Sequence, residues 1–237
     1  MESIAQLRAW VSESRAMVFF GGAGVSTESG IPDFRSVDGL YHQQYPYPPE
    51  TILSATFFHQ HTEEFYRFYR EKMLCLDAQP NAAHRTLAQW ERQGKLTGIV
   101  TQNIDGLHQK AGSQAVWELH GSIHRNHCLQ CRRSYPAETI ARSSGIPRCT
   151  CGGIIKPDVV LYEEQLDGQV LAGAVEAISR ADLMLVGGTS LSVYPAAGLL
   201  SYFRGEHVVL INRSATPMDR QADLVIRDPV GAVLGSL

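Results

Sequence analysis

Short apolar runs recur along the chain, and most of them lack alternation between polar and apolar positions. Strands that are buried on both faces give such runs, because neither side of the strand meets water. Helical patterns separate several of the runs, which favours a parallel sheet covered by helices on both faces, an α/β fold. The expected strands cover 16–20, 96–101, 115–119, 159–162, 182–186, 207–211 and 223–226.

A second pattern, with apolar positions every three or four residues, predicts the helices. They cover 4–14, 51–76, 81–93 and 169–179. The helix over 51–76 carries a stripe of aromatic side chains, which we interpret as core packing because buried aromatic residues usually pack against one another. The stripe consists of Phe57, Phe58, Phe65, Tyr66, Phe68 and Tyr69. The segment 37–49, rich in Tyr and Pro, is expected to be irregular.

Polar and glycine-rich motifs fall at the ends of several expected strands. These motifs cover 21–26, 102–105, 120–121, 187–190 and 212–214. Ligands of parallel sheets bind in the crevice outside the carboxyl ends of the strands. We therefore expect these motifs to line one crevice.

The longest motif reads Gly-Gly-Ala-Gly-Val-Ser-Thr-Glu-Ser-Gly-Ile-Pro-Asp-Phe-Arg and covers 21–35. Its glycines allow a sharp turn and close approach to a ligand, and the residues from Ser26 to Ser29 suit the start of a helix. A strand, a glycine turn and a helix N-terminus in this order bind anions, so we expect the diphosphate of a dinucleotide here. The hydride-transfer version of this motif is incomplete. Thr27 stands in place of its third glycine, and no strand ends in an acid about 20 residues later.

Other strand ends carry side chains suited to catalysis. Gln102, Asn103 and Asp105 follow the strand over 96–101 and favour ligand contact, although loop hydrogen bonds and helix capping by Asp105 are an alternative. His120 ends the next strand and can take a proton near pH 7. The remaining histidines have no comparable placement, and most are interpreted as surface or helix-capping groups. They are His42, His59, His61, His84, His108, His124, His127 and His207.

Four of the five cysteines form two close pairs. The pairs are Cys128 with Cys131 and Cys149 with Cys151. Such pairs are typical of a tetrahedral zinc site, and four thiolates would leave no open position, so the ion would be structural. His124 or His127 in place of one thiolate is an alternative, and free thiols or disulfides are disfavoured by the pairing and by a reducing compartment. Cys75 stands alone and is interpreted as a buried apolar residue on the helix over 51–76.

Composition narrows the functional classes. The chain has 237 residues, a net charge of −3 and 44% hydrophobic residues, which suits one large α/β domain with or without a smaller module. A strongly basic footprint is absent, so no direct nucleic-acid binding is expected. The N-terminal segment lacks the layout of a secretory signal, and no apolar run reaches the roughly 20 residues of a membrane span. These features predict a cytoplasmic protein without membrane contact.

Together the motifs resemble the sirtuins, the NAD-dependent protein-lysine deacylases, and in particular their bacterial type. The resemblance covers nearly the whole chain, with the two cysteine pairs lying between its ordered motifs. These motifs cover 22–26, 30–35, 101–105, 119–121, 156–160, 188–191, 193–195 and 211–212.

This resemblance implies a Rossmann-like parallel-sheet domain and a small domain made of a zinc ribbon and a helical insertion. The large, discontinuous NAD-binding domain would comprise 1–35, 81–122 and 158–237. The small domain would combine the helical insertion 36–80 with the zinc-binding module 123–157. NAD would lie in the crevice between them, and one structural zinc ion would be held by the four paired cysteines.

The resemblance also implies roles for single residues. His120 and Asn103 would be catalytic, His120 as general base and Asn103 by positioning ribose and water. Asp105 with Ile104 would bind the nicotinamide carboxamide, and Phe34 would cover the reacting sugar carbon. The implied NAD contacts are Gly22, Ala23, Gly24, Ser26, Thr27, Asp33, Phe34, Arg35, Gln102, Asn103, Ile104, Asp105, Gly188, Thr189, Ser190 and Asn212.

The implied reaction moves an acetyl group from a protein lysine to the ADP-ribose part of NAD. The acyl oxygen would attack the ribose carbon that bears nicotinamide, and His120 would then activate a ribose hydroxyl. Products would be nicotinamide, free lysine and O-acetyl-ADP-ribose. The implied partners are acetylated-lysine proteins or peptides, bound by a monomer, and mono-ADP-ribosyl transfer from NAD is the closest alternative activity.

The peptide cleft departs from the family pattern. Val160, Tyr162 and Val193 would contact the peptide. Glu163 stands where these enzymes usually carry the glycine of Phe-Gly-Glu, and we expect its charge to favour basic flanking residues. Tyr41 is followed three residues later by Gln44 instead of the arginine of succinyl-preferring members, so an acetyl or other uncharged acyl group is expected.

Two more distant classes stay open. One is a redox enzyme on a dinucleotide fold, which hydride transfer would reveal and which the missing third glycine counts against. The other is a zinc-ribbon binding module without turnover. His120, together with Asn103 and Asp105, argues against such an inert module.

Overall fold

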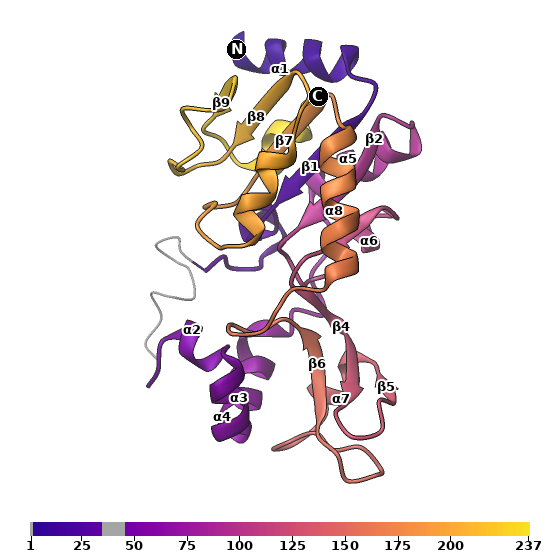
Figure 1. The fold of residues 1–237 in the computed structure, drawn as a ribbon, viewed down its shortest axis with the longest axis vertical. Helices are drawn as coiled ribbons and strands as arrows, with labels where there is room; N and C mark the ends of the chain where they lie inside the picture. Colours follow the sequence, from indigo (N-terminus) through magenta and orange to yellow (C-terminus); the bar gives the residue numbers. More distant parts are fainter. Residues whose placement is uncertain (1, 35–45) are drawn as a thin grey trace.

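Six parallel strands form the main sheet, in the order β3-β2-β1-β7-β8-β9 (Figure 1). The computed structural model describes residues 2–34 and 46–237. The strands of this sheet are β1 (Met17–Gly21), β2 (Leu96–Thr101), β3 (Val116–Glu118), β7 (Leu183–Gly187), β8 (His207–Ile211) and β9 (Leu224–Ile226). The order reverses between β1 and β7, which is where ligands bind in doubly wound sheets. The predicted α/β fold is confirmed.

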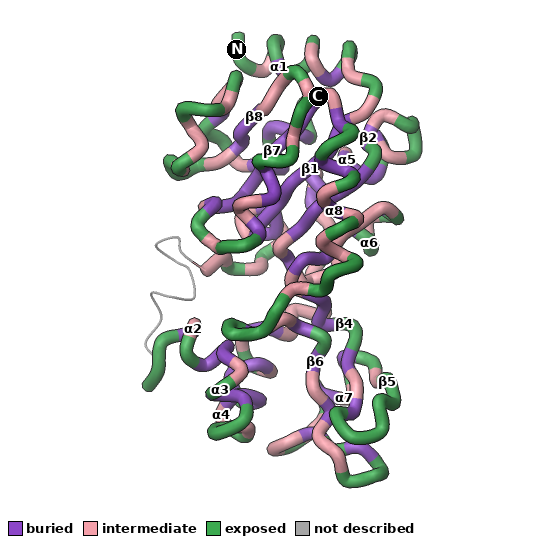
Figure 2. The backbone as a smooth tube through the Cα atoms, in the orientation of Figure 1, coloured by how far each residue is buried: buried purple, intermediate pink, exposed green. Residues whose placement is uncertain are grey.

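Both faces of this sheet are covered, which explains the unbroken apolar runs of its strands. Along β1, Met17 and Phe19 belong to one buried cluster, and Val18 and Phe20 belong to the other. The first cluster packs under α1 (Glu2–Glu13), α5 (Ala82–Arg92) and α9 (Val230–Leu234), and the second under α8 (Gly168–Arg180) and the 3₁₀ helix η5 (Ala196–Tyr202). Figure 2 shows the buried backbone gathered along these central strands. Alternate side chains of a strand point to opposite faces, so every position of β1 is buried.

Local signals place the ends of α5 as the sequence predicts. The Asn81 side chain accepts a hydrogen bond from the Ala83 N–H (2.9 Å), and His84 Nδ1 accepts one from the Asn81 N–H (3.2 Å). These bonds satisfy donors that a helix start leaves free. Gly94 adopts a φ of 73° just after the helix, a left-handed conformation that costs glycine little.

A second, smaller sheet holds three antiparallel strands in the order β5-β4-β6. They are β4 (Gly121–Cys128), β5 (Ser134–Tyr135) and β6 (Ile155–Val159). The helix α7 (Ala137–Ala141) lies between β5 and β6 in the chain. The helices next to it in Figure 1 are α2 (Pro49–Ile52), α3 (Ala55–Gln60), α4 (Thr62–Phe68) and the single π-turn η4 (Tyr69–Met73). One buried cluster joins the aromatic stripe of these helices to Ile123, Ile140 and Ile155, which confirms that the stripe is core.

Two predicted elements are wrong in this smaller part. The helix over 51–76 is a series of short helices, because Ser54 starts a new one by accepting the Phe57 N–H at its Oγ (3.1 Å). The strand over 159–162 is also wrong, since β6 ends at Val159 and the next residues form a loop. That loop is apolar because it packs on its neighbours and hydrogen-bonds to them, with Tyr162 N donating to Leu53 O (2.9 Å). The boundaries of the two-domain division stay a prediction.

Among the helices of the described residues, none combines the length and apolar character that a membrane crossing requires.

Candidate active site

The glycine motif leaves the end of β1 and turns back over the edge of the sheet. It forms two short 3₁₀ turns, η1 (Ala23–Val25) and η2 (Thr27–Ser29), and Gly30 closes the second turn with a φ of 82°. The helix expected to start near Ser26 is therefore wrong, and Ser26 makes no helix-capping bond. Its hydroxyl instead bonds across to another strand end.

The motif lies in backbone contact with the end of β7. Gly24 N donates to Gly188 O (2.8 Å), and a Cβ on Gly24 would lie 2.8 Å from Gly188 Cα. Gly188 has a φ of 60°, and a Cβ there would lie 2.3 Å from Val25 N. A side chain at either position would force the two segments apart, so glycine is required at both. The result is a close backbone contact between the two segments at the strand-order reversal, where ligands of such sheets bind.

A chain of hydrogen bonds crosses from the glycine motif to the end of β2. The Ser26 hydroxyl donates to Asp105 Oδ2 (2.6 Å) and accepts a bond from Asn103 Nδ2 (3.1 Å). Ser26 and Asn103 are buried, with 1% and 7% of their surface exposed. Gln102 Nε2 donates to Thr189 Oγ1 (2.9 Å), which joins β2 to the loop after β7. Residues that the sequence placed on separate strand ends thus meet at one edge.

Asp105 has a second contact that fixes its carboxylate. Its Oδ1 accepts the N–H of Leu107 (2.9 Å) at the start of α6 (Leu107–Lys110). Asp105 thus makes the loop hydrogen bonds expected of it, and its contact with a ligand stays a prediction. Ile104 is half-buried against the core of the smaller part, and its carbonyl accepts the Ile123 N–H (3.0 Å).

His120 lies at the junction of the two sheets, directly before β4. Its Nδ1 lies 3.0 Å from Gln102 O, and because a carbonyl can only accept, Nδ1 carries the proton and Nε2 keeps its lone pair. Burial lowers the pKa of His120 below its ordinary value, and the bond to Gln102 opposes part of that effect. The imidazole is therefore neutral at pH 7, as a general base must be. Gly121 follows with a φ of 77°, and a Cβ there would lie 1.9 Å from Asp158 O, so the turn needs glycine.

The loop after β8 forms the far end of this edge. Asn212 Nδ2 donates to Ser214 O (2.8 Å), and Arg227 Nη1 donates to the same carbonyl (2.8 Å). The sequence singled out Asn212 but not Arg227, which lies just after β9 and carries no motif signal. Ser190 Oγ lies 2.7 Å from Ser192 Oγ in the neighbouring loop.

The other predicted contacts differ in how deeply they are buried. Phe34 packs against the core of the smaller part, and Asp33 is half-buried beside it. Val160 and Val193 are half-buried, whereas Tyr162 is exposed. Arg35, Tyr41 and Gln44 lie outside the described residues, so the expectations for them stay predictions. The remaining predicted NAD contacts, Gly22, Ala23 and Thr27, lie on the glycine motif itself.

Two histidines behind this edge are buried, which corrects the surface interpretation. His84 and His108 are 0% and 1% exposed, and their ring centroids lie 4.8 Å apart. Burial lowers the pKa of both rings, that of His84 to about 4, so both are neutral at pH 7. His84 does cap α5 as expected, but no sequence pattern marks His108, whose burial comes from the packing of α6 against Phe19.

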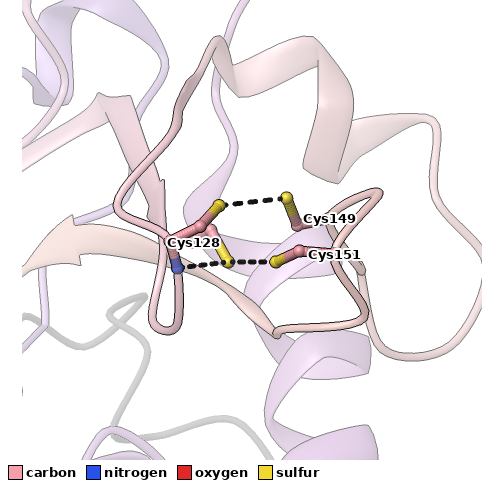
Figure 3. A group of neighbouring side chains, drawn as sticks. Cys128, Cys149 and Cys151 are labelled. Atoms are coloured by element: carbon pink, nitrogen blue, oxygen red, sulfur yellow. Dashed lines mark hydrogen bonds between the residues drawn. The ribbon is translucent and has the colours of Figure 1, made fainter.

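The four paired cysteines converge at the far end of the small sheet (Figure 3). All their Sγ atoms lie within 4.8 Å of one another, with Cys128 and Cys151 at 3.5 Å. A tetrahedral site with Zn–S bonds of about 2.3 Å needs S–S separations of about 3.8 Å, so the cluster fits zinc. Among the described residues the converging ligand atoms are these four thiols, without His124 or His127. Cys75 is half-buried in the loop after η4, not on a helix.

Comparisons with known proteins agree with this geometry. A family model described as the Sir2 family matches residues 22–195. A relative from Clostridium acetobutylicum, named NAD-dependent protein deacetylase, is 60% identical over 99% of this chain and 97% of its own length. A relative of the same name from Cutibacterium acnes is 57% identical over 98% of this chain and 96% of its own length.

Solved structures give the same result. A Sir2 structure with a deacetylated p53 peptide and 3'-O-acetyl-ADP-ribose superposes with a TM-score of 0.91 at 39% identity, covering 98% of this chain and 96% of that one. A structure named Sir2-p53 peptide-NAD+ superposes with a TM-score of 0.87 at 40% identity, covering 98% of this chain and 95% of that one.

Proposed function

The chain belongs to the Sir2 family, and we propose from this premise that it is an NAD-dependent protein-lysine deacetylase. Its relatives at 60% and 57% identity over nearly the full chain bear that activity in their names. The observation that carries the proposal is the hydrogen-bonded set of Ser26, Asn103 and Asp105 at the strand-order reversal, with a neutral His120 beside it.

We propose that NAD lies along this edge of the sheet. Gly22, Ala23 and Gly24 would hold its diphosphate, because the close packing of Gly22 and Gly24 against the loop after β7 places this turn at the strand-order reversal. The adenosine half would lie toward Ser190 and Asn212, at the ends of β7 and β8. Thr27 and Thr189 would line the same edge, as would Asp33, Phe34 and Gln102. When bound, NAD supplies a sugar carbon joined to a cationic leaving group, which a weak oxygen nucleophile in a fixed position can displace.

The residues at the end of β2 would orient the nicotinamide half. Asp105 is held by the Ser26 hydroxyl and the Leu107 N–H, so its carboxylate is fixed before the ligand arrives. With Ile104 it would receive the carboxamide. Asn103 donates to Ser26 from a buried position, and it would position the ribose and a water molecule.

His120 would act as the general base. Its Nδ1 proton is committed to Gln102 O, so Nε2 is the atom that can accept a proton from a ribose hydroxyl. A positioned base of this kind contributes about 10²- to 10⁴-fold to the rate.

The acetylated lysine would enter between the loops that follow β6 and β7. Val160, Tyr162 and Val193 would contact the peptide backbone on either side. One solved Sir2 structure carries a p53 peptide with NAD⁺, which supports a peptide substrate for this chain. The products would be nicotinamide, the free lysine and O-acetyl-ADP-ribose, and an uncharged acyl group is favoured.

The four-cysteine cluster would hold one structural zinc ion. Four sulfur ligands close a tetrahedral site, so the ion would supply no catalytic position and would serve to fold the small sheet. We also propose that the protein acts in the cytoplasm as a monomer, without binding nucleic acid directly, and that its domains follow the boundaries given by the sequence.

The test is incubation with NAD and a panel of acetylated, propionylated and succinylated peptides, following nicotinamide and deacylated peptide together. Deacetylation predicts equal amounts of both products, with the charged succinyl group disfavoured. Nicotinamide release with ADP-ribose left on the peptide would favour mono-ADP-ribosyl transfer instead. Reduction of bound NAD would favour a redox enzyme.

A further inference from the structure

We propose that Glu163 is a positioning residue that latches the peptide-binding loop to helix α3 through Thr56. The peptide-binding loop is the segment 160–164 that follows β6. The inference rests on the proposed function, because that function is what makes this loop a peptide-binding surface.

This loop connects the catalytic edge to the helices of the smaller part. At one end, Val160 N donates to His120 O (3.0 Å). At the other, Tyr162 N donates to Leu53 O (2.9 Å) and Tyr162 O accepts the Ala55 N–H (3.0 Å). The position of the loop relative to α3 therefore sets where a bound peptide lies relative to His120.

Glu163 adds side-chain bonds at the same place. Its Oε2 accepts the backbone N–H of Thr56 (2.8 Å) and the Thr56 hydroxyl (2.7 Å). The first turn of α3 has three donors to satisfy, and Ser54 Oγ takes only the Phe57 N–H. Tyr162 and Glu163 take the two donors before it, so the loop itself completes the start of α3.

The backbone of Glu163 shows why the latch matters. Its φ is 76°, in the left-handed region that disfavours any residue with a Cβ. This explains why glycine is usual at this position in the family. In this chain a glutamate occupies the strained position. The two hydrogen bonds from Thr56 to its carboxylate offset the backbone strain and hold the loop in this conformation.

The neighbouring Glu164 has a different task. Its Oε2 accepts the Leu161 N–H (2.8 Å) and lies 3.1 Å from Lys156 Nζ, so it stabilises the inside of the loop and its link to β6. Glu163, by contrast, reaches across to α3. The Thr56 hydroxyl, and then its N–H, hold the pKa of the Glu163 carboxyl below its ordinary value, so the acceptor is ionised at neutral pH.

The latch and the sequence-based idea of charge selection predict different results for one variant. Glu163→Gln removes the charge but keeps an amide oxygen that can accept from Thr56. Glu163→Ala removes both and keeps the strained φ. If the carboxylate selects basic peptides by charge, the two variants should behave alike; if it latches the loop, only the alanine variant should change.

The experiment combines steady-state kinetics with hydrogen–deuterium exchange of the full chain. We expect Glu163→Ala to raise the KM for an acetylated peptide about five- to tenfold, with kcat and the KM for NAD within about twofold. Glu163→Gln should stay within about twofold of the wild type on both acidic- and basic-flanked peptides. Thr56→Ser should match the wild type, and Thr56→Val should raise the peptide KM about two- to threefold.

Exchange gives a readout that does not depend on turnover. The amides of 54–57 and 160–164 should exchange faster in Glu163→Ala than in the wild type, and Glu163→Gln should not differ. Glu138→Ala is the matched control, since it removes an exposed carboxylate from α7. Unchanged exchange and unchanged peptide KM in Glu163→Ala would overturn the proposal, as would a glutamine variant as impaired as the alanine variant. A wild-type protein without deacetylase activity would refute the proposed function, while the exchange result would still decide whether the latch exists.

Discussion

Loss of the zinc ion should unfold the cysteine-bearing part of the chain and leave the six-stranded sheet intact. The segment between Cys128 and Cys151 has little else to hold it, since β5 has 2 residues and α7 has 5. Ile140 within it and Ile155 just after it are fully buried, and each contributes about 1.5–3 kcal/mol by burial.

That contribution is too small on its own. Ordering a backbone costs about 1–2 kcal/mol per residue, so a few buried side chains do not offset the ordering of this segment. A structural zinc site contributes about 10–16 kcal/mol, several times the contribution of either isoleucine. Because Cys128 and Cys149 are themselves part of the buried cluster shared with α3 and α4, the loss should spread to the peptide-binding loop and abolish turnover.

The assay measures zinc content, thermal unfolding and deacetylation before and after complete chelation. Cys131→Ala and Cys151→Ala, which remove exposed members of the cluster, should lower the zinc content and produce an early unfolding transition. Cys75→Ser is the control, because Cys75 lies outside the cluster and should leave zinc, melting and activity unchanged. Unchanged melting together with full activity after chelation would refute this reasoning.

Three further predictions concern the catalytic edge. His120→Ala should lower kcat about 10²- to 10⁴-fold with thermal unfolding unchanged, and a variant with near-normal turnover would remove His120 from the mechanism. Since burial lowers the pKa of His120, the wild-type rate should hold as pH falls to 6.5, the ordinary pKa of the group, and decline only as pH falls through the lowered value; a decline centred above 6.5 would contradict this. Gly188→Ala should weaken NAD binding at least about tenfold, measured by calorimetry, because its Cβ would lie 2.3 Å from Val25 N. Gly168→Ala, where a Cβ meets nothing within 4 Å, is the matched control, and equal NAD affinity in the two variants would count against NAD binding at this turn.

The large sheet could be predicted from the sequence because each of its central strands carries its own signal. Each strand of its centre is buried on both faces, so the apolar run is visible without knowing the neighbours. The predicted range 96–101 matches β2, and 207–211 matches β8. The small sheet gave no such signal. Its strand β4 reads Gly-Ser-Ile-His-Arg-Asn-His-Cys and pairs with β6 through a register shift between Ser122 and Asn126, which breaks any simple alternation.

In the site too, some features were visible in the local sequence and others depended on the fold. Motifs identified the strand ends, but the contacts that join them depend on topology, as between Ser26 and Asp105, which are 79 residues apart. The sequence also gave no indication that Glu163 would bond to Thr56, 107 residues away, so its charge was the only property to interpret. The buried pair of His84 and His108 was missed for a similar reason, because histidine burial depends on what packs around it.

The most direct test of the central claim follows the acetyl group itself. A peptide with an isotopically labelled acetyl-lysine is incubated with NAD and the purified chain, and the products are separated by mass spectrometry. If the chain is an NAD-dependent protein-lysine deacetylase, the label appears in O-acetyl-ADP-ribose, with one nicotinamide released for each lysine freed. Label recovered as free acetate without consumption of NAD, or ADP-ribose attached to a peptide that keeps its acetyl group, would contradict it.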